Sequence, residues 1–173
     1  LEMGITPNLH LELEYKHLVY SLLKSVNSRH KLNEIDLICT YEAHPKILKF
    51  FKSTRMFIPE TSELSDLIPR KYILEKGGVN CANAALSLVR KLTSGAIYLF
   101  GIDLAFTGNH HHSKHNISQR DNLPENLQGL KEEYINFLKV RGTRGDILRS
   151  KPTQLASKLA IEQSIYDNTI NNI

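Results

Sequence analysis

The stretch AIYLFGIDLAFTGNHHHSKH, residues 96–115, decides the fold that we predict for this chain. Its first seven residues are apolar except for Gly101 and the hydroxyl of Tyr98. This pattern is typical of a strand covered on both faces of a parallel sheet, so we expect a central strand over residues 96–102. Asp103, a turn that starts at Thr107 and four histidines follow. Because ligands bind at the carboxyl ends of strands in open α/β sheets, the stretch also predicts a binding site.

Length and composition are those of a globular protein. The chain has 173 residues, 41% hydrophobic and 23% charged, which suits one domain with a substantial core. No run of about 18 apolar residues and no charged-then-apolar leader is present, so we expect no membrane span and a cytoplasmic location. The net charge is +4, and Lys and Arg are interleaved with Asp and Glu and not collected into a stripe. This distribution argues against nucleic-acid binding. Cys39 and Cys81 are expected to be buried free thiols.

The rest of the chain alternates predicted strands and helices. Hydrophobic periodicity predicts strands over residues 8–14, 35–41 and 56–58, and helices over residues 17–26 and 45–52 and after Asn80. We expect residues 60–76 to form a long connection and residues 134–141 and 146–149 to form a hairpin that precedes a last helix. The order predicts a Rossmann-like α/β fold with a mostly parallel sheet flanked by helices. We expect one domain over residues 1–173 that lacks an upstream strand-turn-helix.

The histidine cluster is the densest group of titratable side chains. Consecutive side chains in an extended loop point apart, and no Cys or carboxylate lies at a familiar ligand spacing, so we expect no dedicated metal site. A histidine has an ordinary pKa of about 6.5 and can take a proton from a hydroxyl near neutral pH. The neighbouring Lys114 can hold a phosphate. The alternative is a solvated loop without function.

Two other groups have both a functional and a structural interpretation. Asp103 either caps its own turn or orients a histidine or binds a sugar hydroxyl. A diglycine turn with two asparagines either offers backbone amides to a phosphate or needs a positive φ; its residues are Gly77, Gly78, Asn80 and Asn83. Glu14 lies near the end of the first strand, from where it can reach the same crevice.

Four motifs together give the chain a resemblance to a known family. They are ITPNLHLELE at 5–14, the diglycine turn with its asparagines, IYLFGIDL at 97–104 and HHSK at 111–114. In this order they resemble the central domain of the motility-associated factor (Maf) proteins, in the domain of unknown function 115 group, over nearly the whole chain. The resemblance implies a Rossmann-like domain similar to that of glycosyltransferase family 42, the bacterial sialyltransferases. It also implies transfer of a nonulosonic acid from its CMP-activated form to Ser or Thr hydroxyls of a protein such as flagellin.

The same resemblance implies roles for individual residues. His112 is the expected base, with Asp103 as the orienting group, and the expected enzyme uses no metal or other cofactor. Ala105 and Phe106 stand where the sialyltransferases place a tyrosine against the leaving phosphate, so we expect Lys114 to take that role. Asn8 stands where the Maf-like motif has Asp. The expected contacts to the nucleotide-sugar come from Gly77, Gly78, Asn80, Asn83, Glu14, Thr107 and Ser113.

Two alternative functions stay open at this point. Archaeal pterin pyrophosphokinases resemble the same group of domains, and their reaction needs Mg²⁺ and ATP. This sequence shows no clear carboxylate pair for such a metal. The second alternative is a non-catalytic nucleotide-binding or metal-binding module with the histidines on a surface loop. The oligomeric state is not predicted by the sequence.

Overall fold

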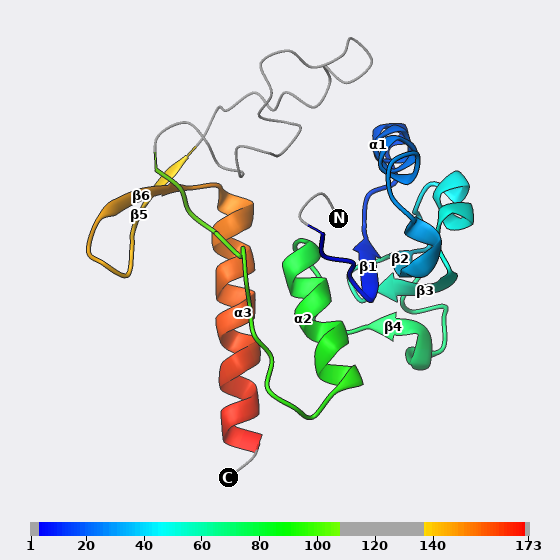
Figure 1. Cartoon of the computed structure of the whole chain (residues 1–173). Coiled ribbons are helices and arrows are strands. Elements are labelled where there is room, and N and C mark those ends of the chain that lie inside the picture. The colour runs from blue at the N-terminus through cyan, green and yellow to red at the C-terminus, as the bar shows by residue number, and fades with distance from the viewer. Residues whose placement is uncertain (1–3, 108–136, 172–173) are drawn as a thin grey trace. The chain divides into compact units, whose positions relative to one another are not determined.

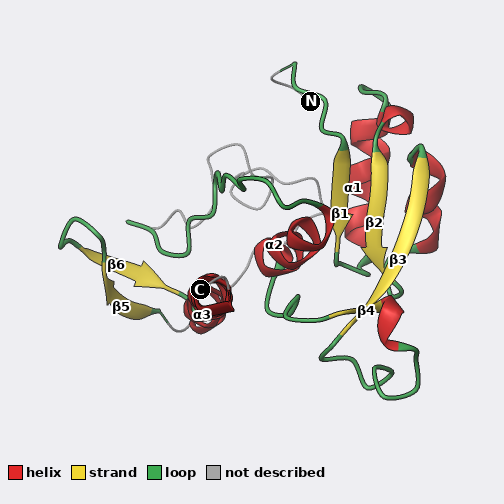
Figure 2. Cartoon of the chain, turned by 90° about the horizontal axis from the view of Figure 1, so that it is seen from below, coloured by secondary structure: helices red, strands yellow, loops and turns green. Residues whose placement is uncertain are grey.

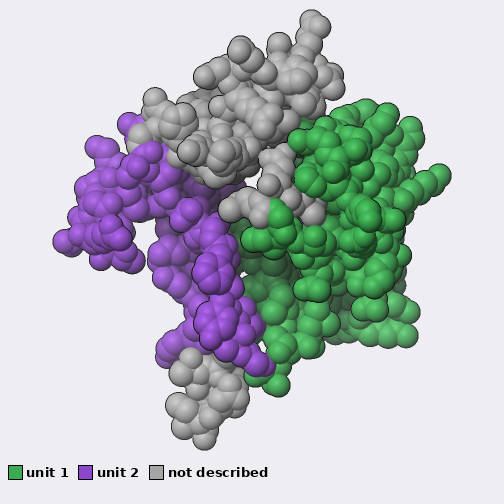
Figure 3. Space-filling model, in the orientation of Figure 1, with its two compact units in different colours: residues 1–94 green, residues 95–173 purple. Residues whose placement is uncertain are grey.

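The computed structural model describes residues 4–107 and 137–171, with side chains to Asp167. The chain divides into two compact units, Leu1–Ser94 and Gly95–Ile173, which Figure 3 shows in different colours. Unit 1 contains a parallel sheet with its helices, and unit 2 contains a hairpin and a long helix (Figure 1). Within the described ranges, no helix is both long and apolar enough to cross a membrane.

The sheet of unit 1 has four parallel strands in the order β1-β2-β3-β4. Leu9 lies opposite Asp36, and Asp36 lies opposite Ser53, so the three longer strands run side by side (Figure 2). The α/β class with a mostly parallel sheet is therefore confirmed. Because β4 lies inside the predicted 60–76 connection, that segment carries more structure than we predicted. The strands are β1 (Leu9–Glu12), β2 (Asp36–Thr40), β3 (Ser53–Pro59) and β4 (Ile73–Leu74).

Helices cover both faces of this sheet because β2 is apolar on both sides. Leu37 and Cys39 face a cluster with α1 (His17–Asn27) and the 3₁₀ helix η2 (Pro45–Phe50), while Ile38 packs with Ala84 of α2 (Cys81–Leu92). Two shorter 3₁₀ helices, η1 (Leu32–Glu34) and η3 (Arg70–Tyr72), lie in the connections. Both cysteines are free, but Cys81 is exposed, so the prediction that it is buried is wrong.

Unit 2 contains the predicted hairpin, formed by β5 (Leu138–Arg141) and β6 (Ile147–Ser150). Gly145 takes a φ of 84° in the turn, a conformation that favours glycine. The backbones of Phe106 and Arg149 exchange two hydrogen bonds of 2.8 and 2.9 Å. The helix α3 (Pro152–Asn171) follows directly. Pro152 is its first residue, a position where the missing amide hydrogen costs little.

The central strand predicted over residues 96–102 is not present. Tyr98 and Phe100 are 78% and 85% exposed, and the sheet of unit 1 takes no strand from this part of the chain. Gly101 has a φ of 69°, which interrupts an extended backbone. The prediction is wrong because an apolar run forms a strand only where neighbouring strands supply hydrogen bonds and cover. In this structure the hairpin pairing begins four residues later, at Phe106.

Candidate functional site

A cleft of about 370 Å³ opens in unit 1 at the carboxyl ends of three strands, where α2 begins. Parallel α/β sheets bind ligands at this edge. The cleft combines apolar walls with a few polar groups, which is the usual make-up of a small-molecule site. Its lining consists of Leu13, Thr40, Glu42, Phe57, Pro59, Thr61, Gly77, Gly78, Val79 and Asn80.

A second hollow of about 510 Å³ adjoins this cleft and shares Glu42, Pro59 and Thr61 with it. The hydroxyl of Tyr41 donates a hydrogen bond of 3.2 Å to Glu42 Oε1 and lies 3.2 Å from Ser62 Oγ. These contacts tie the segment after β3 to the end of β2. Glu42, Pro59 and Thr61 therefore form a boundary common to both hollows.

The diglycine turn forms part of the cleft through close packing. A Cβ at Gly78 would lie 3.2 Å from Thr61 Cγ2 across the cleft, and one at Gly77 would lie 2.9 Å from Leu74 Cγ. Neither glycine has a positive φ; the positive φ of 53° belongs to Lys76, one residue earlier. The alternative that the glycines serve a positive φ is therefore wrong. A Cβ at Gly77 would meet the buried side chain of Leu74, and one at Gly78 would meet the exposed side chain of Thr61 across the cleft.

Lys76 holds the turn in an uncommon backbone conformation. Its φ of 53° is rare for a residue with a side chain and costs of order 1–3 kcal/mol. Its amide donates a hydrogen bond of 2.9 Å to Glu60 Oε2, which opposes this cost. The strain therefore lies directly before the diglycine and fixes the direction in which the chain enters α2.

Asn80 caps α2 and fixes the helix start at the rim of the cleft. Its Oδ1 accepts hydrogen bonds from the amides of Ala82 (2.9 Å) and Asn83 (3.3 Å). The N-terminus of a helix carries a partial positive charge that favours anions. Asn83 is 3% exposed and lies within α2, outside the cleft lining. Of the two asparagines, only Asn80 therefore borders the cleft.

The end of β1 is organised by Glu12, which sequence reasoning did not select as a site residue. Its side chain is 12% exposed, and its Oε1 accepts a hydrogen bond of 2.7 Å from the amide of Glu14. Glu14 itself is half-exposed, forms an ion pair of 3.3 Å with Lys16, and does not line the cleft. Thr40 Oγ1 donates to the carbonyl of Leu13 (3.5 Å) and joins the ends of β1 and β2.

The buried thiol of β2 is not a nucleophile at neutral pH. Burial raises the pKa of Cys39 to about 11, and the negative charge of Glu12 adds to the effect. A thiol reacts as its thiolate, which this pKa suppresses at pH 7. Among the described residues, no group of three or more His, Cys, Asp or Glu side chains is placed to hold a metal ion.

The structure brings together part of the predicted site. Gly77, Gly78 and Asn80 line one cleft. Asp103 and Thr107 are exposed residues of unit 2. His112, Ser113 and Lys114 lie outside the described residues, so their placement stays a prediction.

Sequence reasoning missed three polar residues of the cleft, Thr40, Glu42 and Thr61. A signal was available for the first two, because they stand at and just beyond the end of a strongly apolar predicted strand. Polar residues at that position meet the ligand edge of a parallel sheet. Thr61 lies in the segment that we predicted as a connection, and no local pattern marks it.

Comparisons with known proteins agree with this architecture. Residues 1–109, more than half of the chain, match the family described as 6-hydroxymethylpterin diphosphokinase MptE-like. The structure is similar to that of a Maf glycosyltransferase from Magnetospirillum magneticum AMB-1, with 18% sequence identity and a TM-score of 0.68. The similarity covers 92% of this chain and 23% of the other, so this chain spans about a quarter of that protein's length. No curated protein matches the chain. The resemblance to the Maf proteins is thereby confirmed, and that to glycosyltransferase family 42 stays a prediction.

Proposed function

The chain belongs to the 6-hydroxymethylpterin diphosphokinase MptE-like family, and from this premise we propose that it binds a nucleotide at the diglycine cleft as part of a glycosyltransferase. The observation that carries the proposal is the cleft itself, which lies where parallel sheets bind ligands. Its volume of about 370 Å³ falls in the usual range for small-molecule sites. The similarity in fold to a Maf glycosyltransferase supports transfer of a sugar.

The cleft offers different chemistry to each part of such a ligand. The apolar walls, which include Phe57 and Val79, suit a base, and the start of α2 suits a phosphate. The Glu42 carboxylate keeps acceptor sites beyond its bond to Tyr41, so it can accept hydrogen bonds from ribose or sugar hydroxyls. We expect a CMP-activated nonulosonic acid as the donor and a protein hydroxyl, such as one of flagellin, as the acceptor.

In the proposed reaction the protein forms no covalent bond with the substrate. A CMP-linked sugar already carries a good leaving group, so the protein binds the nucleotide, deprotonates the acceptor hydroxyl and stabilises the departing phosphate. His112 is the proposed base, Lys114 the proposed phosphate partner and Asp103 the proposed orienting group. Thr107 and Ser113 are proposed to contact the nucleotide-sugar.

The proposal is tested by separating nucleotide binding from transfer in the full-length protein. We expect CMP to raise the melting temperature more than ATP does, because a ligand that binds only the folded state stabilises it. The variant His112→Ala should keep the CMP affinity within about twofold and lose at least about a hundredfold in transfer rate, as for removal of a general base. His115→Ala, in the same cluster, is the matched control and should keep transfer. Equal transfer by His112→Ala and wild type would refute the assigned base.

A second candidate function is favoured by the family match, whose description names a 6-hydroxymethylpterin diphosphokinase. That reaction transfers a diphosphate from ATP and releases AMP. Incubation with ATP, Mg²⁺ and 6-hydroxymethylpterin distinguishes the two candidates. AMP release that depends on the pterin would favour the kinase, and a cytidine-selective thermal shift without AMP release would favour the glycosyltransferase.

A further inference from the structure

A separate, basic cleft of unit 1 lies at the end of the sheet opposite the diglycine cleft. Its volume is about 520 Å³, and three of its lining residues are the cations Arg29, Lys31 and Lys49. The rest of the lining consists of two asparagines, a serine, a histidine and Phe50, so no acidic residue lines it. Arg29 and Lys31 follow α1 and precede β2, and Lys49 precedes β3. These positions mark the amino ends of the strands.

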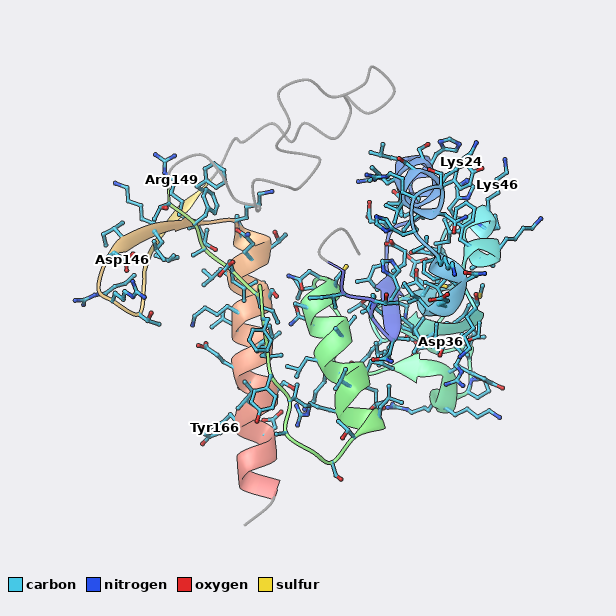
Figure 4. All side chains as sticks on the ribbon, in the orientation of Figure 1. Lys24, Asp36, Lys46, Asp146, Arg149 and Tyr166 are labelled. Carbon is cyan, nitrogen blue, oxygen red and sulfur yellow. The ribbon has the colours of Figure 1, made fainter. Side chains whose placement is uncertain are left out.

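The excess of basic over acidic residues lies in the sequence segment 16–55, which contains the cations of this cleft. Residues 16–55 contain eight Lys and Arg but only three Asp and Glu, whereas the remainder contains 14 and 15. Figure 4 shows Lys24 of α1 and Lys46 of η2 on the same side of unit 1. Basic side chains outside the cleft lining therefore lie on both of these helices.

Local effects account for only part of this arrangement. A cation near the C-terminus of a helix is favoured by the helix dipole, which explains Arg29 after α1 and Lys49 in the last turn of η2 one at a time. Lys31 lies 3.5 Å from Glu34, but the two side chains are 80% and 56% exposed, and such a surface pair contributes little. Arg29 Nε also donates a hydrogen bond of 3.3 Å to the carbonyl of Ser25. These effects act on each cation separately, and none of them requires the three cations to line one concave surface.

We propose that the basic cleft is a docking site for an acidic segment of a partner protein. Carboxylates of such a segment would meet the three cations, and the side-chain amides of Asn27 and Asn33 can bond to its backbone. β2 has five residues, and a strand rises about 3.3 Å per residue. The amino end of the sheet, with the basic cleft, is therefore about 16 Å from the carboxyl end, with the diglycine cleft. A partner bound here therefore leaves the diglycine cleft open to its own ligand.

Two other polyanions fit the surface less well. Single-stranded nucleic acid is held by exposed aromatic rings between basic groups, but Phe50, the aromatic residue that belongs to this lining, is half-buried and stacks on Tyr20 at 5.9 Å. A membrane surface is bound by apolar side chains that enter the lipid as well as by cations. None of the large exposed hydrophobic residues among the described positions lines this cleft.

The test measures binding of a fluorescent poly-glutamate peptide to the full-length protein by anisotropy, at 50 and 300 mM NaCl. The double variant Arg29→Glu/Lys49→Glu should raise the Kd at least tenfold at low salt. The control Lys71→Glu/Lys91→Glu makes the same change in net charge at exposed positions outside the cleft and should change the Kd less than twofold. Binding should weaken at high salt because screening acts on exposed charges.

Several results would overturn the proposal. No binding of poly-glutamate by the wild type at 50 mM NaCl would do so, as would equal effects of the two double variants. Tighter binding of poly-uridine or of phosphatidylglycerol vesicles than of poly-glutamate would assign the surface to another class of partner. The neutral variant Arg29→Gln/Lys49→Gln, with an unchanged circular dichroism spectrum, separates loss of charge from loss of fold. Nucleotide binding is measured in parallel and should not change in any of these variants.

Discussion

The two glycines of the diglycine turn should respond very differently to the same added methyl group. In Gly77→Ala, the new Cβ would lie 2.8 and 2.9 Å from Cδ2 and Cγ of Leu74 and 3.3 Å from its carbonyl oxygen, well inside the optimum carbon separation of about 3.5–4.0 Å. Leu74 cannot yield easily, because it is 3% exposed and packs with Ile38, Phe57 and Ala84. Overpacking of this kind costs about 1–3 kcal/mol.

In Gly78→Ala, the methyl group meets a wall that can move. The Cβ would lie 3.2 Å from Thr61 Cγ2, and Thr61 is exposed. A small steric cost is then offset by the lower entropy of the unfolded alanine chain, which contributes about 0.4–1 kcal/mol. We expect Gly78→Ala to change the stability by no more than about 0.5 kcal/mol. The same methyl group narrows the cleft, so nucleotide binding should weaken.

The assay reads the opening of unit 1 through Cys39, which is fully buried. In a Cys81→Ser background, labelling of Cys39 by iodoacetamide at increasing urea gives a midpoint for this unit alone. With a slope of about 2 kcal/mol/M, a loss of about 1–3 kcal/mol lowers the midpoint of Gly77→Ala by about 0.5–1.5 M. Adding Leu74→Ala should remove most of the extra loss, because it creates space for the methyl group. A Gly77→Ala midpoint equal to that of the wild type, or a Gly78→Ala midpoint lowered as far, would refute the packing argument.

Two further predictions concern the helix cap and the buried thiol. Replacing Asn80 by Ala removes the bonds to the amides of Ala82 and Asn83 and should cost about 0.5–2 kcal/mol in the same labelling assay, whereas Asn80→Asp should retain the stability; equal losses would exclude capping as the cause. The pKa of Cys39 is raised from 9.0 to about 11 in the folded chain, so the folded state holds its proton where the unfolded state releases it. The contribution of this thiol to the free energy of unfolding is fully present below pH 9 and decreases as the pH rises towards 11. The urea midpoint, followed by circular dichroism, should therefore fall more steeply from pH 8 to 10.5 in the wild type than in Cys39→Ala, and parallel curves would contradict the shift.

The elements that the sequence predicted well are those with a strong local pattern. The alternation of leucines in β1, the apolar run of β2 and the helical spacing in α1 are local properties of neighbouring residues. The turn from Gly142 to Gly145 likewise carries its own signal, and the structure contains that hairpin. Gly77, Gly78 and Asn80 could be selected as site residues because a diglycine before a helix is a local signal as well.

The incorrect predictions of strands have one physical cause. Whether a segment is buried or paired depends on residues from distant parts of the chain. Residues 96–102 have the composition of a buried strand, yet Phe100 is 85% exposed, because burial depends on which neighbours are present and not on the run itself. The two-residue strand β4 exists only through its pairing with Ile58 and Pro59, and no local pattern predicts it.

The sequence by itself therefore determined the class of fold, the order of most elements and the glycine turn of the cleft. Tertiary structure alone decided that Thr61 joins Thr40 and Glu42 in that cleft and that Arg29, Lys31 and Lys49 converge at the opposite edge. The physical reason is the parallel register, which brings the ends of successive strands to common edges of the sheet. Residues far apart along the chain become neighbours there, and no periodicity within any one segment records their meeting.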